Sequence, residues 1–133
     1  MNVRKIEEKD LEKAYQIYER CFQVKIKRHH LERKTTLLGL FLEEELIGIA
    51  QIDFIYNLFE DTVIAYINSL GVDPDYQNRG YGDFFLKQII FYSKKCGANK
   101  IQLTSNKNRV CAHHLYLKND FCIVDTIFFK KEI

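Results

Sequence analysis

The spacing of hydrophobic residues along this 133-residue chain changes between two periods, and each period predicts one kind of element. In the middle of the chain, three apolar runs are joined by short polar turns, which is the pattern of an antiparallel meander. On either side, apolar residues recur every three or four positions, as on the buried face of a helix. The predicted helices are residues 8–21, 82–96 and 109–118, and the predicted strands are residues 1–6, 37–43, 46–56, 62–72, 99–104, 121–124 and 126–130.

Two further features complete this outline. Residues 23–36 are basic and polar, and we expect a second short helix there, around residues 29–33, in the easiest place for a substrate-facing loop. The strand, helix and strand between residues 62 and 104 imply a parallel pair of strands joined by a right-handed crossover. The sequence therefore predicts a mixed sheet with helices packed against it.

The join between the strand at 62–72 and the helix at 82–96 contains two glycines, Gly80 and Gly82, where the helix begins. The start of a helix leaves about four backbone N–H groups without a partner, and the helix dipole adds roughly half a positive charge there. Glycine at such a place lets a ligand approach the backbone closely. The join therefore predicts an anion site, most often one for phosphate.

Two common phosphate motifs do not fit this join. The Walker A pattern, G-x-x-x-x-G-K-[ST], is absent from the sequence. The dinucleotide fingerprint G-x-G-x-x-G would begin at Gly80, but Phe85 occupies the place of its third glycine, where a large ring would block close packing of helix and strand. The strand before the join also belongs to a meander and not to a repeated β-α-β unit. Both nucleotide interpretations are therefore weak.

Composition narrows the class of protein without choosing a function. The formal net charge of +2 is too balanced for a nucleic-acid-binding surface, and we expect the basic cluster within residues 25–34 to be an ordinary solvated face. The four cysteines form no C-x-x-C pair and the histidines complete no zinc pattern, so we expect no metal site and reduced, packed thiols. No signal peptide or membrane-spanning run is visible, which favours a cytoplasmic protein of one domain, residues 1–133.

The pattern that does fit the join is Gln-x-x-Gly-x-Gly, at residues 77–82, and with it the chain resembles the GNAT superfamily of acyl-CoA-dependent N-acetyltransferases. The preceding segment, residues 69–74, is similar to the family's strand and splayed turn. Farther on, Asn106 and residues 112–121 resemble the family's Asn loop and its Ala-His-x-x-Tyr-x-Lys-x-Gly-Phe segment. These pieces agree in order and spacing, and the resemblance covers nearly the whole chain.

This resemblance implies a fold class and a donor. The fold would be α/β (α+β), with a mixed, mostly antiparallel central sheet, a splayed parallel strand pair and flanking helices. The donor would be acetyl-CoA, a co-substrate used without a metal. Its pyrophosphate would lie on backbone amides of the join, and its pantetheine arm would satisfy unpaired backbone groups of the preceding strand. The implied donor-binding residues are Leu70, Gly71, Val72, Gln77, Asn78, Arg79, Gly80, Tyr81, Gly82, Asp83, Asn106 and Tyr116.

The implied reaction is direct attack of a neutral amine on the thioester. Tyr116 matches the family position that acts as general acid to the sulfur, and a phenol with an ordinary pKa of about 10 stays protonated at neutral pH. The backbone amide near Leu70 would polarise the thioester carbonyl and stabilise the oxyanion. The general base stays open: residues 62–70 contain no carboxylate, and Glu60 and Asp61, at the turn before them, are the nearest acids.

Other chemically active side chains in the matched segment have simpler explanations. His113, where the family often has a structural histidine, and His114 are expected to have no catalytic role. Cys111 and Cys122 lack a partnered histidine and acid at a readable spacing, which favours packed thiols over acyl-accepting nucleophiles. Asp120 replaces the glycine that is usual in the family, and because Asp tolerates the left-handed conformation better than most residues, we expect the turn to survive.

Three functions are compatible with these residues. The first is an N-acetyltransferase that moves an acetyl group from acetyl-CoA to a primary amine of a small molecule or a protein. The second is a non-catalytic acyl-CoA-binding or interaction module, favoured by the missing strand carboxylate and disfavoured by the retained Tyr116. The third, nucleic-acid binding through residues 25–34, is weak and would appear as salt-dependent affinity for DNA or RNA. The family often dimerises, which leaves a homodimer open, although no dimer surface is legible in the sequence.

Overall fold

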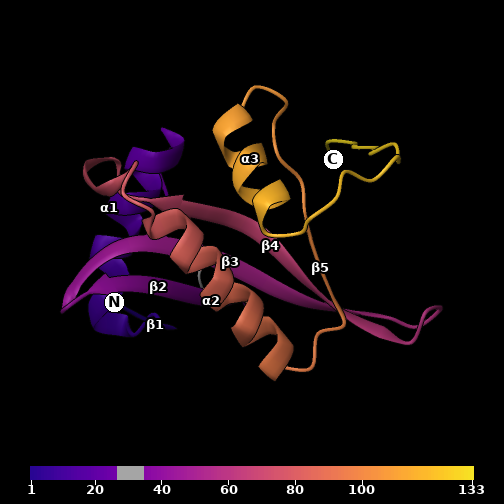
Figure 1. The fold of residues 1–133 in the computed structure, drawn as a ribbon, viewed down its shortest axis with the longest axis horizontal. Helices are drawn as coiled ribbons and strands as arrows, with labels where there is room; N and C mark the ends of the chain where they lie inside the picture. Colours follow the sequence, from indigo (N-terminus) through magenta and orange to yellow (C-terminus); the bar gives the residue numbers. More distant parts are fainter. Residues whose placement is uncertain (27–34) are drawn as a thin grey trace.

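The elements follow the order that the hydrophobic pattern predicts, up to the end of the last helix (Figure 1). The computed structural model describes residues 1–26 and 35–133, so the short helix expected around residues 29–33 lies outside the described residues. The elements are β1 (Asn2–Lys5), η1 (Glu8–Asp10), α1 (Leu11–Phe22), β2 (Thr36–Leu42), β3 (Glu45–Asn57), β4 (Thr62–Val72), η3 (Pro74–Tyr76), α2 (Tyr81–Lys95), β5 (Lys100–Leu103) and α3 (Val110–Lys118).

The described strands form one five-stranded sheet in the order β1-β2-β3-β4-β5. The first three pairs are antiparallel and only β4 and β5 run parallel. The predicted meander is therefore confirmed, as is the crossover through α2 that joins the parallel strands. The fold is α/β (α+β), with a mixed and mostly antiparallel sheet between helices.

Helices cover both faces of this sheet (Figure 1). On one face, α2 buries Phe85, Leu86 and Ile89 against the central strands. On the other face, α1 buries Ala14 and Ile17 in a smaller cluster. Phe85, which occupies the place of the third glycine of the dinucleotide fingerprint, is fully buried. Its ring is therefore a main contact between α2 and the sheet. The remaining core members are Leu38, Leu40, Ile47, Ala50, Ile52, Ala65 and Ile67 on the α2 face, and Phe41, Leu46 and Ile49 on the α1 face.

Strand β4 pairs with its two neighbouring strands over different lengths. Its parallel pairing with β5 ends at the pair of Ile67 with Leu103, whereas its pairing with β3 continues to Val72. Directly after Ile67, the register with β3 shifts, so that Asn68 is an extra residue on β4. Such a bulge bends a strand and increases its local twist. Beyond the bulge, the outer edge of β4 has no strand partner among the described residues, which is the splayed pair that the resemblance implies.

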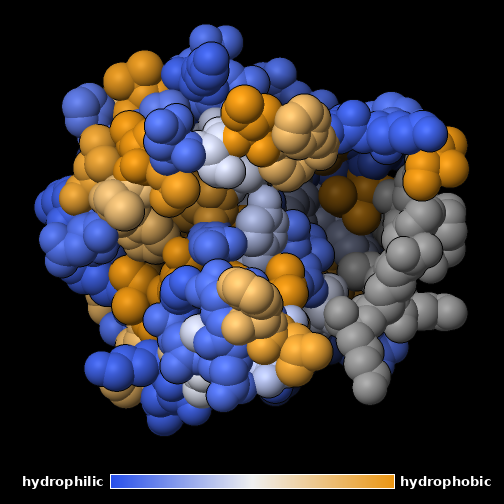
Figure 2. Space-filling view, turned by 90° about the vertical axis from the view of Figure 1, so that its right-hand side faces the viewer, coloured by the Kyte–Doolittle hydropathy of each residue, from blue (hydrophilic) through white to orange (hydrophobic). Residues whose placement is uncertain are grey.

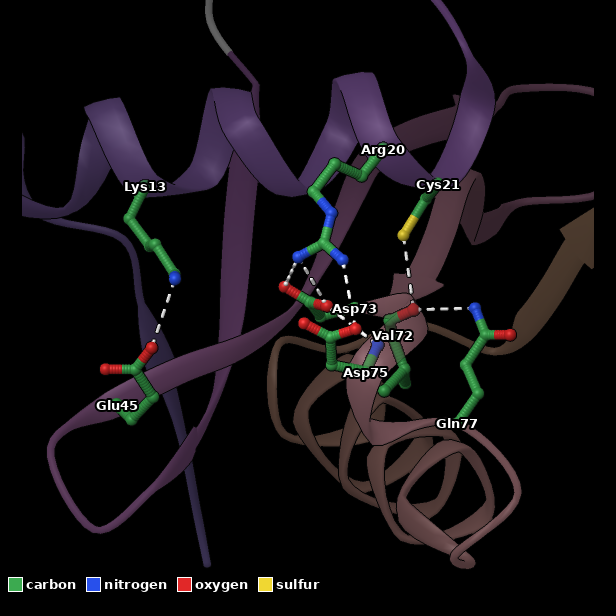
Figure 3. A network of polar contacts seen from close by, with 8 residues as sticks. All are labelled: Lys13, Arg20, Cys21, Glu45, Val72, Asp73, Asp75 and Gln77. Atoms are coloured by element: carbon green, nitrogen blue, oxygen red, sulfur yellow. Dashed lines mark hydrogen bonds and ion pairs between the residues drawn. The ribbon is translucent and has the colours of Figure 1, made fainter.

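A network of polar contacts fastens α1 to the turn that follows β4 (Figure 3). The buried carboxylate of Asp73 accepts hydrogen bonds from the backbone N–H of Asp75 at 2.9 Å and from the guanidinium of Arg20 at 2.8 and 2.9 Å. The Cys21 thiol donates to the Val72 carbonyl at 3.2 Å. The end of α1 lies so close to β4 that a Cβ built on Gly71 would meet the Cys21 sulfur at 3.0 Å. Helix α1 therefore fixes where the strand ends and the turn begins.

The two strands expected at residues 121–124 and 126–130 do not form. Their backbone has no strand neighbour, and the segment leads away from the open edge of β5 (Figure 1). Figure 2 views the side where the C-terminus and the tip of the β3–β4 hairpin lie in Figure 1, and hydrophobic side chains reach the surface there in several groups. The residues of these two segments have a high propensity for strands, but a strand also needs the edge of another strand to pair with. The exposed apolar side chains of the segment are Ile123, Val124, Ile127, Phe128, Phe129 and Ile133.

The Asp73 contacts predict a stability difference between two neighbouring aspartates. Asp73→Ala removes the buried acceptor of Arg20 and of the Asp75 N–H, and should lower the free energy of unfolding by about 2 kcal/mol. Asp75→Ala is the matched control, because Asp75 also contacts Arg20, at 3.2 Å, but its side chain is 73% exposed, and an exposed pair contributes little. Urea unfolding followed by circular dichroism measures both. Equal losses in the two variants would contradict this account.

Candidate functional site

The loop between η3 and α2 has an unusual backbone. Asn78 and Gly80 both adopt left-handed conformations, with φ of 63° and 83°. Left-handed residues in such turns allow successive N–H groups to converge on one anion. A Cβ built on Gly80 would meet nothing within 4 Å, so the space over this residue is open. The conformation requires a residue such as glycine, and the open space is available to a ligand.

The first turn of α2 adds unpaired donors to this loop. The first helical hydrogen bond runs from the Phe84 N–H to the Gly80 carbonyl, at 3.2 Å. The N–H groups of Tyr81, Gly82 and Asp83 precede it and have no acceptor within the helix. Together with the helix dipole they supply the donors that the predicted anion site would need.

The side chains around the loop hold it in place. The Gln77 amide donates to the Val72 carbonyl at 2.9 Å (Figure 3). The Tyr76 ring lies 6.4 Å from the Tyr81 ring, and the Arg79 guanidinium lies 5.8 Å from the Tyr76 ring centroid. Gln77, Asn78 and Arg79 are exposed. The loop is therefore anchored from inside while its outer surface remains accessible.

Asp83 ties α2 to α3 at this end of the molecule. Its carboxylate accepts hydrogen bonds from Lys87 at 2.6 Å and from the Asn119 amide at 2.9 Å. Hydrogen bonds from Lys87 and then Asn119 hold the pKa of Asp83 below its usual range. A Cβ on Gly82 would stand 3.7 Å from the Leu115 side chain, which places α3 against the first turn of α2. This contact brings α3 to the join.

Tyr116 lies on α3 with its ring 5.7 Å from the Phe121 ring. Burial raises the pKa of the Tyr116 phenol, and the positive charge of Arg109 opposes this in part. Within the described part of the chain, no hydrogen bond to the Tyr116 hydroxyl is formed. Asp120 adopts the left-handed conformation, with φ of 67°, so the turn at the end of α3 survives the loss of the family's glycine as expected.

The segment before α3 is organised by side chain to backbone contacts. The Asn106 side chain accepts from the Asn108 N–H at 2.9 Å, and the His113 imidazole lies 2.9 Å from the Asn106 carbonyl and 3.1 Å from the Ser105 hydroxyl. His113 thus holds the loop on α3. Cys111 and Cys122 are exposed, unlike the packed thiols that were expected.

Glu60 does not lie with these groups. It sits in the turn between β3 and β4 and pairs with Lys100. At about 3.3 Å per strand residue, the part of β4 from Thr62 to Leu70 separates this turn from the splay by roughly 25 Å. The structure therefore brings α3, which carries Tyr116, against the join that follows β4, and leaves Glu60 at the far end of that strand.

A second carboxylate, which was not predicted from the sequence, lies beside the bulge. Asp53 on β3 accepts a hydrogen bond from the Asn68 amide, and the Gln51 amide lies 3.4 Å from the same oxygen. Next to them, the Tyr18 hydroxyl of α1 lies 2.5 Å from the Ser69 hydroxyl. The available signal was two polar residues, Gln51 and Asp53, spaced by two in an otherwise apolar strand.

Among residues 1–26 and 35–133, no group of three or more His, Cys, Asp and Glu side chains could hold a metal ion. None of the described helices has the length and apolar character that crossing a membrane requires.

Comparisons with known proteins agree with this geometry. A family model described as "Acetyltransferase (GNAT) family" matches residues 3–121. The search of curated proteins finds no match. Similar solved structures include a transcriptional regulator from Bacillus halodurans C-125, with 21% identity, 99% of each chain covered and a TM-score of 0.84.

Two acetyltransferase structures are also similar. An aminoglycoside acetyltransferase, meta-AAC0020, from an uncultured soil metagenomic sample in complex with sisomicin has 17% identity over 99% of this chain and 95% of that chain, with a TM-score of 0.84. A GNAT family acetyltransferase from Staphylococcus aureus subsp. aureus USA300_TCH1516 has 17% identity over 99% and 98%, with a TM-score of 0.77. At these identities the likeness shows the fold alone. The family model spans most of the chain, and the protein therefore belongs to the GNAT family of acetyltransferases.

Proposed function

We propose that this chain is an N-acetyltransferase that transfers an acetyl group from acetyl-CoA to a primary amine by direct attack on the thioester. The observation that carries the proposal is the join of β4 and α2, where an open left-handed loop and unpaired N–H groups adjoin a free strand edge. Membership of the GNAT family, whose members usually use acetyl-CoA, supports the same donor.

The donor is proposed to bind along two surfaces that meet at the join. The diphosphate takes the N–H groups of the loop and first helical turn, with Arg79 at its edge. The pantetheine arm pairs with the outer edge of β4. The Val72 carbonyl already accepts from Cys21 and Gln77, and Leu70, two residues earlier, presents its backbone groups to the same edge. The proposed donor-binding residues are Leu70, Gly71, Val72, Gln77, Asn78, Arg79, Gly80, Tyr81, Gly82, Asp83, Asn106 and Tyr116.

Two groups of the chain are proposed to act on the thioester. The Leu70 N–H donates a hydrogen bond to the thioester oxygen and stabilises the negative charge that develops there. The Tyr116 hydroxyl gives its proton to the departing sulfur. This role is supported by the hydroxyl's lack of a partner within the described residues and by a raised pKa, which keeps the phenol protonated. Because Glu60 is remote and paired, the proposal assigns it no part in catalysis.

The acceptor is proposed to be an amine of a small molecule or of a protein. A similar structure is an aminoglycoside acetyltransferase in complex with sisomicin, so sisomicin is a rational first acceptor to test. A non-catalytic acyl-CoA-binding module on the same fold is the second candidate. Release of free thiol from acetyl-CoA over a panel of amines separates the two, since a module would bind acetyl-CoA without turnover.

The chain is proposed to act as one domain over residues 1–133 and in the cytoplasm. A homodimer stays a prediction, and the exposed apolar segment after α3 gives it a surface to test by light scattering. Nucleic-acid binding through residues 25–34 is not part of the proposal, and most of that cluster lies outside the described residues.

The open join predicts that Gly82→Ala weakens donor binding without harming the fold. The added Cβ would have only an ordinary contact, 3.7 Å from the Leu115 side chain, and alanine is favoured over glycine in a helix by about 1 kcal/mol. The variant should therefore melt no lower than the wild type. Because the methyl group occupies space next to the proposed phosphates, we expect CoA affinity, measured by calorimetry, to fall about tenfold or more.

Lys94→Ala, in the last turn of the same helix, controls for a general effect of changing α2. Its CoA affinity should equal that of the wild type. Wild-type affinity in Gly82→Ala would rule out the join as the phosphate site.

Tyr116→Phe tests the proposed acid. The variant should lower kcat by about 100-fold, since it removes only the proton donor, and should leave the KM for acetyl-CoA nearly unchanged. Tyr56→Phe, at the distant end of β3, is the control and should behave as wild type. An unchanged kcat in steady-state thiol release would remove Tyr116 from the mechanism.

The pKa of Tyr116 also fixes the direction of a pH effect. A general acid works below its pKa and is lost as the pH rises through it. Because burial raises this pKa above its ordinary value of about 10, the Tyr116 contribution should persist across neutral pH and decline only above about pH 10. The ratio of wild-type to Tyr116→Phe kcat, followed against pH, measures this directly.

A further inference from the structure

We infer that Asp53 is the acceptor-binding carboxylate and the general base, and that the acceptor is a cationic primary amine. The inference rests on the proposed function and adds the acceptor half of the site. The observation that carries it is a half-buried carboxylate, held by neutral amides at the bulge of β4, one residue from the point where β4 leaves β5.

The position of Asp53 follows from the sheet. Side chains two apart on a strand share a face, so Asp53 lies on the face of Gln51 and Ile49. Ile49 packs against α1, and Asp53 therefore lies on the α1 face. The opposite face carries α2 and Tyr116. An acceptor on Asp53 would thus meet the strand edge from one face, while the acid approaches from the other.

The bulge connects Asp53 to the donor edge. Asp53 pairs in register with Tyr66, and the β4 pairing with β5 ends one residue later, at Ile67. Asn68, the extra residue of the bulge, is the next residue on β4, and its amide donates to the Asp53 carboxylate. Leu70, the proposed oxyanion donor, follows two residues further. The carboxylate and the proposed thioester position are therefore separated by only a few residues of backbone.

The charge of Asp53 has no cationic partner in the described part of the chain. Its hydrogen-bond donors are the Asn68 and Gln51 amides, which orient a carboxylate but do not neutralise it. The neighbouring hydroxyls of Tyr18 and Ser69 bond to each other. A carboxylate with neutral partners in a half-buried place attracts a ligand cation, and an alkylammonium group supplies both the charge and N–H donors.

The electrostatics of Tyr18 agree with this placement. Burial, together with the negative charge of Asp53, raises the pKa of the Tyr18 phenol to about 12, although the Ser69 hydrogen bond opposes the shift. The Tyr18 hydroxyl therefore remains neutral and cannot itself be the base at neutral pH. Tyr66 points its hydroxyl to Thr104, at 3.2 Å, and is likewise occupied. With both tyrosines excluded, the Asp53 carboxylate is the candidate base at the bulge.

The proton balance of the transfer is complete with these groups. An alkylammonium bound to Asp53 gives one proton to the carboxylate and becomes a neutral amine. The nitrogen lone pair forms the new C–N bond, the C–S bond breaks, and the Tyr116 proton goes to the sulfur. The nitrogen then loses its second proton, which restores the Tyr116 phenol, and Asp53 returns its proton to water. The products are the acetamide, free CoA and one released proton.

The test compares cationic and neutral acceptors in the full chain. Spermidine and sisomicin are cationic near neutral pH, whereas p-anisidine is a neutral amine that needs no proton removed before attack. We expect Asp53→Asn to lower kcat/KM for spermidine and sisomicin by about 100-fold or more, and to leave kcat/KM for p-anisidine nearly unchanged. Asp125→Asn, an exposed aspartate in the C-terminal segment, is the matched control and should behave as wild type with every acceptor.

A second variant protects the test against a folding defect. Asn68→Ala changes an exposed side chain and removes the amide that orients Asp53, so it should raise KM for spermidine several-fold with less effect on kcat than Asp53→Asn. Circular dichroism and calorimetric CoA binding establish that each variant folds and keeps its donor site. Wild-type kinetics with spermidine and sisomicin in both variants would overturn the inference.

The outcomes also separate this inference from the proposed function. If the wild-type chain binds acetyl-CoA and acetylates p-anisidine but neither cationic amine, the proposed transferase stands and the assignment of a cationic acceptor to Asp53 is wrong. If the wild-type chain does not bind acetyl-CoA, the proposed function fails first, and the inference fails with it.

Discussion

The unequal pairing of β4 is the constraint on which the rest of the structure depends. One edge of this strand is held by β3 as far as Val72, while the other loses β5 after Ile67. A strand within a sheet usually pairs along both edges, because backbone groups need partners. Here the open edge adjoins a loop and helix start that also present unpaired donors. Two sets of unpaired backbone groups thus meet at the join.

Helix α1 contacts the same end of β4 from the face of the sheet opposite to α2. Arg20 and Cys21 contact the turn and the last strand residue, and Tyr18 contacts the bulge through Ser69. The end of this one helix therefore touches both the proposed acceptor side and the start of the proposed donor loop. A shift of α1 would therefore move the proposed acceptor side and the proposed donor loop together. The positions of the two proposed substrate sites are thus coupled through α1.

The sequence was most informative where a local rule decides the structure. Glycine spacing and a helix start placed the join, and the tolerance of Asp for positive φ explained Asp120. It was least informative where the answer depends on distant residues. Glu60 lies nearer to the join in sequence than Asp53 does, but it stands at the far end of an extended strand, whereas Asp53 reaches the bulge through strand register. The two C-terminal strands were wrongly predicted for the same reason, because pairing needs an edge supplied by another part of the chain.

The reactivity of the Cys21 thiol reports on the contact between α1 and β4. Burial raises the pKa of its thiol to about 11, and its sulfur lies against the backbone of Gly71 and the Val72 carbonyl. Since only the thiolate reacts readily, Cys21 is protected from alkylating and oxidising reagents while the helix stays docked. The other three cysteines are exposed and can be blocked first. The slow labelling that remains at Cys21 then requires the last turn of α1 to separate from the strand. Its rate therefore measures the frequency of local opening at this site.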